Sequence, residues 1–456
     1  MFSKDLVWWK SEVVFLILFS VIAVYTLQVV KETPAPEYDS LRYIDYSLSL
    51  YKHNIFGLAK ADFSHLPEPG SANVPLYPLF IYGIINLDSD LYDSLNCFLI
   101  NNKNNNSCSV ALQTIVFFQN LLICLALLMI WLASRVLFQN SVVAWFSVIF
   151  MLLSGLPHYY SNRILTEILV IFFYSGLFLS LVLSLKHGQL RWWMLMSLFI
   201  ALLTLTRPEY LYLFCVTILF IIGYTFLYKR KDCVKIILSV AVIYILCISP
   251  WLSRNYFQFN KVFITEGYSS EILVQRVAYN EMSLKEWGIS FIYWFPDFGD
   301  SLAIRLFNKS SYERLGFGSG SFYEYGNTVL REKIRNEVTK DEMTGYLLKN
   351  EILAYPAKHL MVTTVLLWRA MFIGKYWGIF GAFCFIVCLV QTLRNKKFNF
   401  LLVSLPAWFM AILYASISVS ITRYNLGLLF IYSMSMAWCT DRIFLYFNQK
   451  RSLIND

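Results

Sequence analysis

Long runs of apolar residues constrain this chain more than any other feature of its sequence. A helix of about 17 to 25 apolar residues is long enough to cross the roughly 30 Å hydrocarbon core of a membrane. Only 15% of the residues are charged and 58% are hydrophobic, whereas a soluble domain averages about 25% charged residues. We therefore expect an all-α polytopic membrane protein with about ten transmembrane helices, at roughly 12–30, 110–134, 140–157, 164–185, 192–206, 209–228, 233–251, 373–393, 398–420 and 424–446.

The first run, Val13 to Val30, follows Lys4 and Lys10 and at first resembles a secretory signal. It is longer than the apolar region of a typical signal peptide, and no small-x-small cleavage site follows it. We expect this run to be retained as the first transmembrane helix.

Basic residues in the short connections indicate the orientation of the helices. Lys and Arg accumulate in the cytoplasmic loops of membrane proteins. With ten helices, the basic connections near 186–191, 229–235 and 394–397 all fall on the same side as the two termini. We therefore expect cytoplasmic termini and a multi-pass protein of a bacterial inner (plasma) membrane. The net charge of +9 belongs to this bias, so we expect membrane lipids and not nucleic acid as partners.

Two segments on the outer side, residues 31–109 and 252–372, are too long to be simple connections. In the second segment Leu330, Ile334 and Val338 recur at helical spacing among charged residues, which predicts a short amphipathic helix. We treat the whole chain, 1–456, as a single transmembrane domain that carries these two outer segments.

Residues 357–374 are apolar but include Lys358, His359 and Arg369. A further membrane span here would move the basic connection at 394–397 to the outer side, against the charge bias. We therefore expect an interfacial helix at 357–374, at the end of the second outer segment.

Most of the nine cysteines lie in apolar runs, where cysteine behaves as a small hydrophobic residue. Cys97 and Cys108 instead lie in the polar part of the first outer segment. Outer compartments are oxidising, so these two residues either form a disulfide or remain two free thiols. Histidine and carboxylate residues show no ligand spacing, so the sequence indicates no metal-ligating residues and no cofactor. It leaves open whether the activity depends on a metal ion.

Ionisable residues at the outer ends of the helices form the candidate site. An arginine at a helix end often only extends to the lipid headgroups, and this is our interpretation of Arg163. Glu167 lies about one turn inside its span, where an isolated carboxylate is costly, so we expect a cationic partner or a water-filled cavity beside it. The other candidates of this kind are Asp39, Arg207, Glu209, Arg254 and Arg423.

One carboxylate and several arginines at one membrane face suit chemistry on a lipid-linked phosphate. Arginine stays charged and binds phosphate oxygens with two parallel hydrogen bonds. A carboxylate such as Asp39 can take the proton from an acceptor hydroxyl. A sugar that leaves from a phosphate needs no general acid, because neutralising the departing anion is sufficient.

The same residues occur in motifs that resemble those of the GT-C glycosyltransferases, in the branch related to protein O-mannosyltransferases and aminoarabinose transferases. Each motif is loose, but the ordered set covers most of the chain and is fairly specific. In chain order the motifs are Tyr38-Asp39-Ser40, Val74-Pro75-Leu76-Tyr77-Pro78, Leu165-Thr166-Glu167, Leu205-Thr206-Arg207-Pro208, Pro250-Trp251-Leu252-Ser253-Arg254-Asn255-Tyr256 and Thr422-Arg423-Tyr424.

The resemblance implies an inverting glycosyltransferase that uses a polyprenyl-phosphate sugar at the outer face of the membrane, with Asp39 as the catalytic base. The chain departs from the family pattern in two places: Ser40 replaces the second acidic residue common in relatives, and Asn73 stands where a basic residue is usual. Together with the outer charges, the resemblance predicts substrate contacts for Tyr77, Glu167, Arg207, Glu209, Arg254, Asn255, Arg423 and Tyr424.

The main alternative is a transporter, a flippase or an O-antigen-polymerase-like protein that handles lipid-linked saccharides. Such proteins also use outer arginines on a multispan scaffold, but transporters more often show paired halves or helices broken by Gly or Pro. A purely structural scaffold would leave the outer charges unexplained. The sequence leaves open which sugar is transferred and whether the acceptor is a glycan, a lipid or a protein.

Overall fold

The structure is a computed structural model that describes residues 38–58, 66–100, 112–266, 268–339, 342–396 and 398–455. The described residues are almost entirely helical, and their only strands are β1 (Gly57–Leu58) and β2 (Glu68–Pro69), which pair antiparallel with Gly57 opposite Pro69. The chain divides into two compact units. Unit 1 is Met1–Ile264 with Thr440–Asp456, unit 2 is Thr265–Cys439, and each is described by itself.

Seven of the described helices are long and apolar enough to cross a membrane: α5 (Leu112–Phe138), α8 (Glu167–His187), α10 (Tyr210–Leu227), α11 (Cys233–Phe259), α19 (Tyr376–Arg394), α20 (Asn399–Ile417) and α21 (Gly427–Asn455). Two shorter apolar helices, α6 (Ser141–Leu153) and α9 (Leu190–Thr206), occupy two further predicted spans. The prediction of an all-α polytopic membrane protein is therefore confirmed. The predicted span at 12–30 lies outside the described residues.

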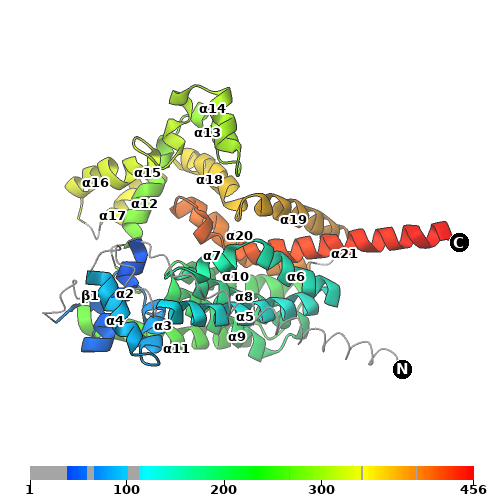
Figure 1. Cartoon of the computed structure of the whole chain (residues 1–456), viewed down its shortest axis with the longest axis horizontal. Coiled ribbons are helices and arrows are strands. Elements are labelled where there is room, and N and C mark those ends of the chain that lie inside the picture. The colour runs from blue at the N-terminus through cyan, green and yellow to red at the C-terminus, as the bar shows by residue number, and fades with distance from the viewer. Residues whose placement is uncertain are drawn as a thin grey trace. The chain divides into compact units, whose positions relative to one another are not determined.

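The helices of unit 1 from α5 to α11 run alongside one another (Figure 1), with the short α7 (Leu156–Ser161) between α6 and α8. α8 packs against both α5 and α9, and α9 packs against α11. The apolar stretch of α8 is 78% buried, whereas that of α11 is only 22% buried. α8 is therefore the central helix of this bundle and α11 a peripheral one.

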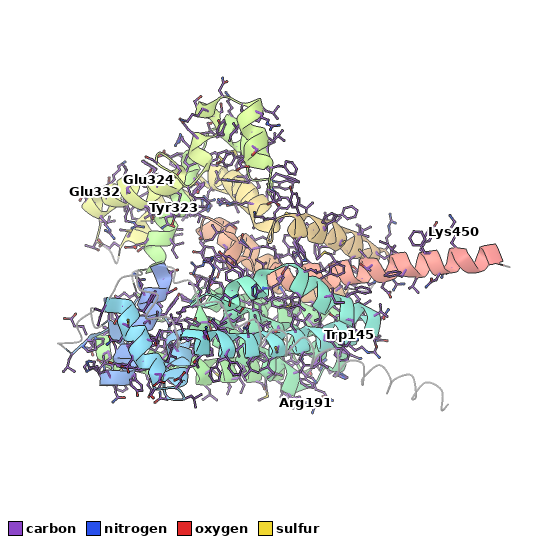
Figure 2. The ribbon with its side chains drawn as sticks, in the orientation of Figure 1. Trp145, Arg191, Tyr323, Glu324, Glu332 and Lys450 are labelled. Carbon is purple, nitrogen blue, oxygen red and sulfur yellow. The ribbon has the colours of Figure 1, made fainter. Side chains whose placement is uncertain are left out.

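Contacts between loops agree with the predicted alternation of the spans. α8 ends at His187 and is capped by Gly188, whose φ of +65° favours glycine. Arg230 donates to the Gly188 carbonyl at 2.9 Å, which joins two connections predicted to lie on one side of the membrane. Arg191, in the first turn of α9 (Figure 2), belongs to the same connection as Gly188. Which side of the membrane this is remains a prediction.

The first outer segment contains α2 (Tyr38–His53), the two strands, α3 (Leu76–Ile85) and α4 (Asp90–Ile100), which gather at one end of the unit 1 helices (Figure 1). α2 packs on α3 and α4, and Ser47 of α2 donates to the Pro78 carbonyl at 3.0 Å. Cys97 of α4 is disulfide-bonded, whereas Cys108 lies outside the described residues.

Unit 2 begins with α12 (Tyr268–Ala278), η2 (Tyr279–Glu281), α13 (Leu284–Tyr293) and α14 (Gly299–Leu306). A capping box of Ser283 and Glu286 fixes the start of α13. Its other elements before α19 are η3 (Lys309–Ser311), η4 (Glu313–Leu315), α15 (Phe322–Tyr325), η5 (Gly326–Leu330), α16 (Arg331–Glu337), α17 (Met343–Leu347), η6 (Leu348–Ile352) and α18 (Pro356–Met371). η7 (Thr422–Tyr424) lies between α20 and α21.

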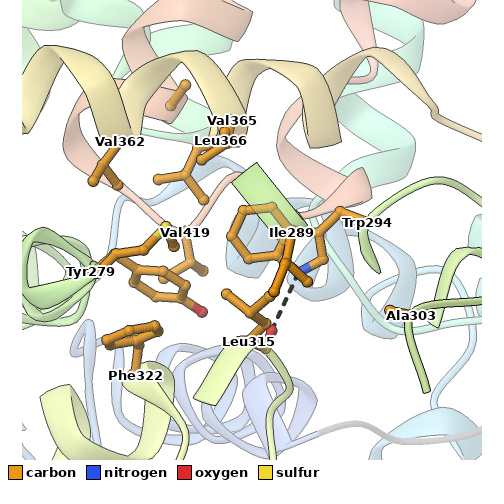
Figure 3. Packing of buried hydrophobic residues seen from close by; sticks show 12 residues of the cluster. Tyr279, Ile289, Trp294, Ala303, Leu315, Phe322, Val362, Val365, Leu366 and Val419 are labelled. Atoms are coloured by element: carbon orange, nitrogen blue, oxygen red, sulfur yellow. Dashed lines mark hydrogen bonds between the residues drawn. The ribbon is translucent and has the colours of Figure 1, made fainter. Parts of the chain in front are cut away.

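The core of unit 2 is largely apolar and aromatic (Figure 3). Tyr279 and Phe322 pack against each other with ring centroids 5.4 Å apart. The Trp294 indole donates to the Leu315 carbonyl at 3.1 Å, which satisfies its buried N–H. Val362 and its neighbours on α18 complete the cluster.

Both predicted helices of the second outer segment are present. Leu330 and Ile334 are buried on one face of η5 and α16, and Val338 is partly buried beside them. A short amphipathic helix is thus present, but it ends at Glu337, so Val338 follows it in extended backbone. Residues 357–374 form most of α18 and the turn that follows it. Its interfacial position remains a prediction.

Candidate functional site

A buried ion pair lies where α8 begins and α9 ends. Arg207 Nη2 is 2.5 Å from Glu167 Oε1, and Arg207 Nε donates to the Thr166 hydroxyl at 3.0 Å. Glu167 has no exposed surface, and Arg207 is 7% exposed. The cationic partner expected for Glu167 is therefore confirmed. Because both charges are buried, each depends on the other for its stability.

Tyr77 lies close enough to this pair for the charge of Glu167 to affect its pKa. Tyr77 lies on α3, and its hydroxyl donates to Gln119 Oε1 of α5 at 2.8 Å. Gln119 in turn donates to the carbonyls of Ser161 and Arg163 at 2.7 and 3.0 Å. Burial and then the negative charge of Glu167 raise the pKa of Tyr77 well above its usual value. Tyr77 is therefore a protonated hydrogen-bond donor at neutral pH.

Asp39 lies in the first turn of α2, where the helix dipole favours a carboxylate. Tyr43 is one turn further along the same face of α2. Its ring meets the ring of Tyr77 edge-on, with centroids 5.2 Å apart. Asp39 therefore lies on the same face of α2 as the residue that contacts Tyr77.

Arg254, near the end of α11, binds the first outer segment. It donates to the carbonyls of Phe56 and Gly70, each at 2.8 Å. A third hydrogen bond goes to Asn255 Oδ1, also at 2.8 Å, and the Asn255 amide donates to the Phe263 carbonyl. Gly70 permits this arrangement, because an added Cβ would lie 2.5 Å from the Tyr46 ring. Arg254 thus connects α11 to the chain around the two strands, and Asn255 connects Arg254 to the chain after α11.

A cavity of about 490 Å³ opens beside Arg254. Its walls come from α2, the strands, α3, α9 and α11, and most of the lining side chains are apolar. Its lining residues include Leu50, Phe56, Pro75, Leu79, Leu205, Cys247, Pro250, Trp251, Arg254 and Gln258. A cavity of this size and composition suits a small apolar or amphipathic ligand.

The remaining predicted site residues lie elsewhere. Glu209 is half-buried at the start of α10, two residues after Arg207. Arg423 and Tyr424 belong to unit 2, where Arg423 lies over the Tyr424 ring at 5.9 Å. Tyr424 also stacks on Tyr414, with centroids 4.9 Å apart. That they share a site with the unit 1 residues remains a prediction.

Some groups of the site were not predicted from the sequence. Gln119 lies in a long apolar run, and such an isolated amide is a usable signal, because a buried amide needs partners. The carbonyls of Phe56 and Gly70 could not be predicted as acceptors from the sequence, because every residue carries a backbone carbonyl. In the part of the chain that the structure describes, no group of three or more His, Cys, Asp or Glu residues could hold a metal ion.

The comparisons with known proteins address the same region. Residues 108–253 match the model of the dolichyl-phosphate-mannose-protein mannosyltransferase family. Among solved structures, the chain is similar to ArnT from Cupriavidus metallidurans bound to undecaprenyl phosphate, at 11% identity and a TM-score of 0.41. That match covers 93% of this chain and 76% of the other. A search of curated proteins found no match.

The family match covers about a third of the chain and ends just before Arg254. It contains Glu167, Arg207 and Glu209, but neither Asp39 nor Tyr77. The family pattern across α5 to α11 contains the middle motifs of the ordered set, and the first and last motifs lie outside it. The resemblance of this membrane protein to the GT-C glycosyltransferases is confirmed.

Proposed function

We propose that this protein is a membrane glycosyltransferase that moves a sugar from a polyprenyl-phosphate donor to an acceptor hydroxyl at the outer face of a bacterial inner membrane. The observation that carries the proposal is the buried Glu167–Arg207 pair, because it lies within the segment that matches the mannosyltransferase family. Beside it, Tyr77 connects the pair to α2, which carries Asp39 in its first turn.

The apolar cavity beside Arg254 supports a donor with an isoprenoid chain. Apolar walls favour hydrocarbon, and the guanidinium provides a charge for the phosphate. In this proposal the phosphate replaces the carbonyl partners of Arg254, so that an ionised donor meets an ionised acceptor. Asn255 then acts as a positioning residue for Arg254.

The reaction is a single displacement. The acceptor oxygen attacks the anomeric carbon, the bond from that carbon to the phosphate oxygen breaks, and its electron pair leaves with the phosphate. The hydroxyl proton passes to the Asp39 carboxylate. Attack from the face opposite the leaving phosphate inverts the anomeric centre. Glu167 holds Arg207 in place, while Arg207, Glu209, Arg423 and Tyr424 contact donor or acceptor.

Transfer by the purified protein tests this function directly. The wild type in lipid nanodiscs should transfer labelled sugar from a polyprenyl-phosphate donor to an envelope lipid fraction. Mass spectrometry of that fraction would identify both sugar and acceptor. Movement of the intact donor across a vesicle membrane without any transfer would contradict the proposal and support the transporter alternative.

Two substitutions at one position separate the phosphate contact from the loop contact. Arg254→Lys keeps the charge but cannot reproduce the planar fork that reaches two carbonyls. Arg254→Ala removes both. If Arg254 neutralises the phosphate, the lysine variant should bind polyprenyl phosphate about tenfold or more tightly than the alanine variant. Equal, strongly weakened binding by both variants would assign Arg254 to holding the loop alone.

A further inference from the structure

Unit 2 contains a second cavity, of about 350 Å³, that none of the family motifs covers. It lies where the connection from α13 to α14 meets the end of α18 and the start of α19. The residues that matter here are Tyr293, Trp294, Asp297, Asp300, Arg369 and Lys375. They combine aromatic walls with both hydrogen-bond donors and acceptors.

Arg369 brings an unpartnered hydrogen-bond donor, Nη1, to this cavity. Its guanidinium lies 4.7 Å from the centre of the Phe317 ring and 5.2 Å from that of Trp294. Burial lowers its pKa from the usual value. Among the described residues no carboxylate lies within ion-pair distance of it, and its buried Nη1 has no hydrogen-bond partner. Such a buried donor is costly unless a ligand or water satisfies it.

The other charges of the cavity limit what that ligand can be. Lys375 Nζ lies 3.1 Å from Asp297 Oδ1, so these two charges offset each other. Asp300 accepts a hydrogen bond from the backbone N–H of Ser301 at 2.7 Å and keeps further acceptor capacity. An anion would meet the Asp300 carboxylate and a cation would meet Arg369. A neutral ligand with many hydroxyl groups satisfies both, because each hydroxyl donates and accepts.

The backbone around the cavity has an uncommon conformation. Asp297 and Lys375 have φ values of +65° and +58°, although neither is glycine. Such conformations cost about 1 kcal/mol or more and concentrate at ligand sites. The residues concerned are the two partners of the ion pair, one from each connection.

We propose that this cavity binds one saccharide residue, with the apolar face of the sugar ring against Tyr293 and Trp294. Arg369 donates to the ring hydroxyls, and the Asp300 carboxylate accepts from them. That this saccharide belongs to the acceptor glycan rests on the proposed transferase function. The binding itself does not, since it needs neither donor nor transfer.

Saturation-transfer NMR on the full-length protein in nanodiscs tests this assignment without any reaction. The probes are the methyl glycosides of glucose, galactose, mannose and N-acetylglucosamine, with inorganic phosphate as the anionic probe. At least one glycoside should bind to the wild type. Asp300→Asn and Arg369→Gln should each weaken it about tenfold or more, because each removes a hydrogen bond to a charged group.

The matched control is Glu332→Gln, which changes an exposed carboxylate on α16 of the same unit (Figure 2) and should leave binding unchanged. Asp300→Asn keeps the shape of a surface side chain, so it remains informative if Arg369→Gln unfolds the unit. The proposal is overturned if no glycoside binds, if Asp300→Asn binds like the wild type, or if phosphate displaces the glycoside. Normal glycoside binding without any sugar transfer would contradict the transferase function and leave this site standing.

Discussion

Burial makes the Glu167–Arg207 pair sensitive to single substitutions. Removing one partner of a buried pair leaves an uncompensated charge and costs roughly 3–5 kcal/mol. Glu167→Gln and Arg207→Gln should therefore each lower the free energy of unfolding by about that amount. The double variant should lose less than the sum, because no charge then remains alone. Chemical denaturation in detergent measures all three.

Arg230→Gln is the matched control for that experiment. Its ion pair with Asp232 has side chains that are 23% and 38% exposed, and exposed pairs contribute about 0–1 kcal/mol. A loss at Arg207 no larger than the loss at Arg230 would show that the buried pair has no special role in stability.

The role proposed for Asp39 is tested by Asp39→Asn. The amide keeps the shape of the side chain but cannot take a proton, so turnover should fall by about 10²–10⁴-fold. Donor binding should largely survive, because Asp39 acts on the acceptor hydroxyl. Rates of transfer and affinity for polyprenyl phosphate, measured in parallel, separate the two effects.

Asp45→Asn serves as the control for Asp39, since it makes the same change on another face of the same helix. It should transfer sugar at the rate of the wild type. Near-normal transfer by Asp39→Asn would end its role as base. An equal loss of donor affinity and turnover would instead show that Asp39 holds the shape of the site.

The sequence predicted the partner of Glu167 but not the backbone partners of Arg254. A carboxylate inside a span requires a partner, so a cation beside Glu167 could be expected. The carbonyl acceptors of Arg254 could not, because they depend on how the chain around the two strands is folded. The unpartnered Nη1 of Arg369 was missed for a related reason: in the sequence Arg369 resembles any arginine at a helix end.

Among the elements, α12 and α18 are joined by a buried polar network. Arg276, with no exposed surface, donates to the His359 carbonyl and the Thr363 hydroxyl of α18 and to Asn280 of η2. It also donates to the Ala415 carbonyl of α20 at 2.8 Å. Burial, and then the positive charge of Arg276, lower the pKa of His359 to about 4.

The network predicts that unit 2 loses stability in mild acid. The folded protein keeps His359 neutral, whereas the unfolded chain binds the proton near pH 6.5. The contribution of neutral His359 to the free energy of unfolding is complete above about pH 6.5. It is lost as the pH falls toward 4, to a limit of about 3 kcal/mol. Thermal unfolding between pH 4 and pH 7 should show it.

His359→Gln should flatten that pH dependence, because glutamine does not titrate. His187 is exposed, and His187→Gln should keep the slope of the wild type. A slope unchanged in His359→Gln would mean that other groups cause the acid sensitivity.

Helices were more predictable than the chain between them. η5 and α16 followed from the helical spacing of Leu330 and Ile334, although the helix ends before Val338. α18 followed from an apolar run with charges inside it. α6 ends at Leu153, short of the predicted span 140–157, because Ser154-Gly155 ends it. α9 ends at Thr206 as predicted, directly before Arg207-Pro208. The strands were not predicted, since two residues each give no periodic pattern.

At the scale of the whole molecule, the predicted topology can be tested with single cysteines. Lys231 and Ser319 are both exposed and are predicted to lie on opposite sides of the membrane. In intact cells a membrane-impermeant thiol reagent should label Ser319→Cys and not Lys231→Cys. Both should be labelled after the membrane is opened.

The unsubstituted protein gives the background for that experiment, because it carries its own cysteines. Labelling of Lys231→Cys in intact cells, or none of Ser319→Cys, would contradict the orientation. The length of the apolar runs was enough to predict a polytopic protein. The division into two compact units was not predicted, because it depends on contacts between distant segments.

The low burial of α11 has a consequence for how a substrate arrives. α11 supplies Cys247, Pro250, Trp251, Arg254 and Gln258 to the larger cavity, yet most of its apolar surface lies outside the bundle. In a bilayer that surface meets lipid. A substrate carried on a polyprenyl chain can therefore arrive sideways, by diffusion in the plane of the membrane. For such a substrate the concentration that sets the rate is its mole fraction among the lipids, and adding empty lipid should slow the reaction although the amounts of protein and substrate stay constant.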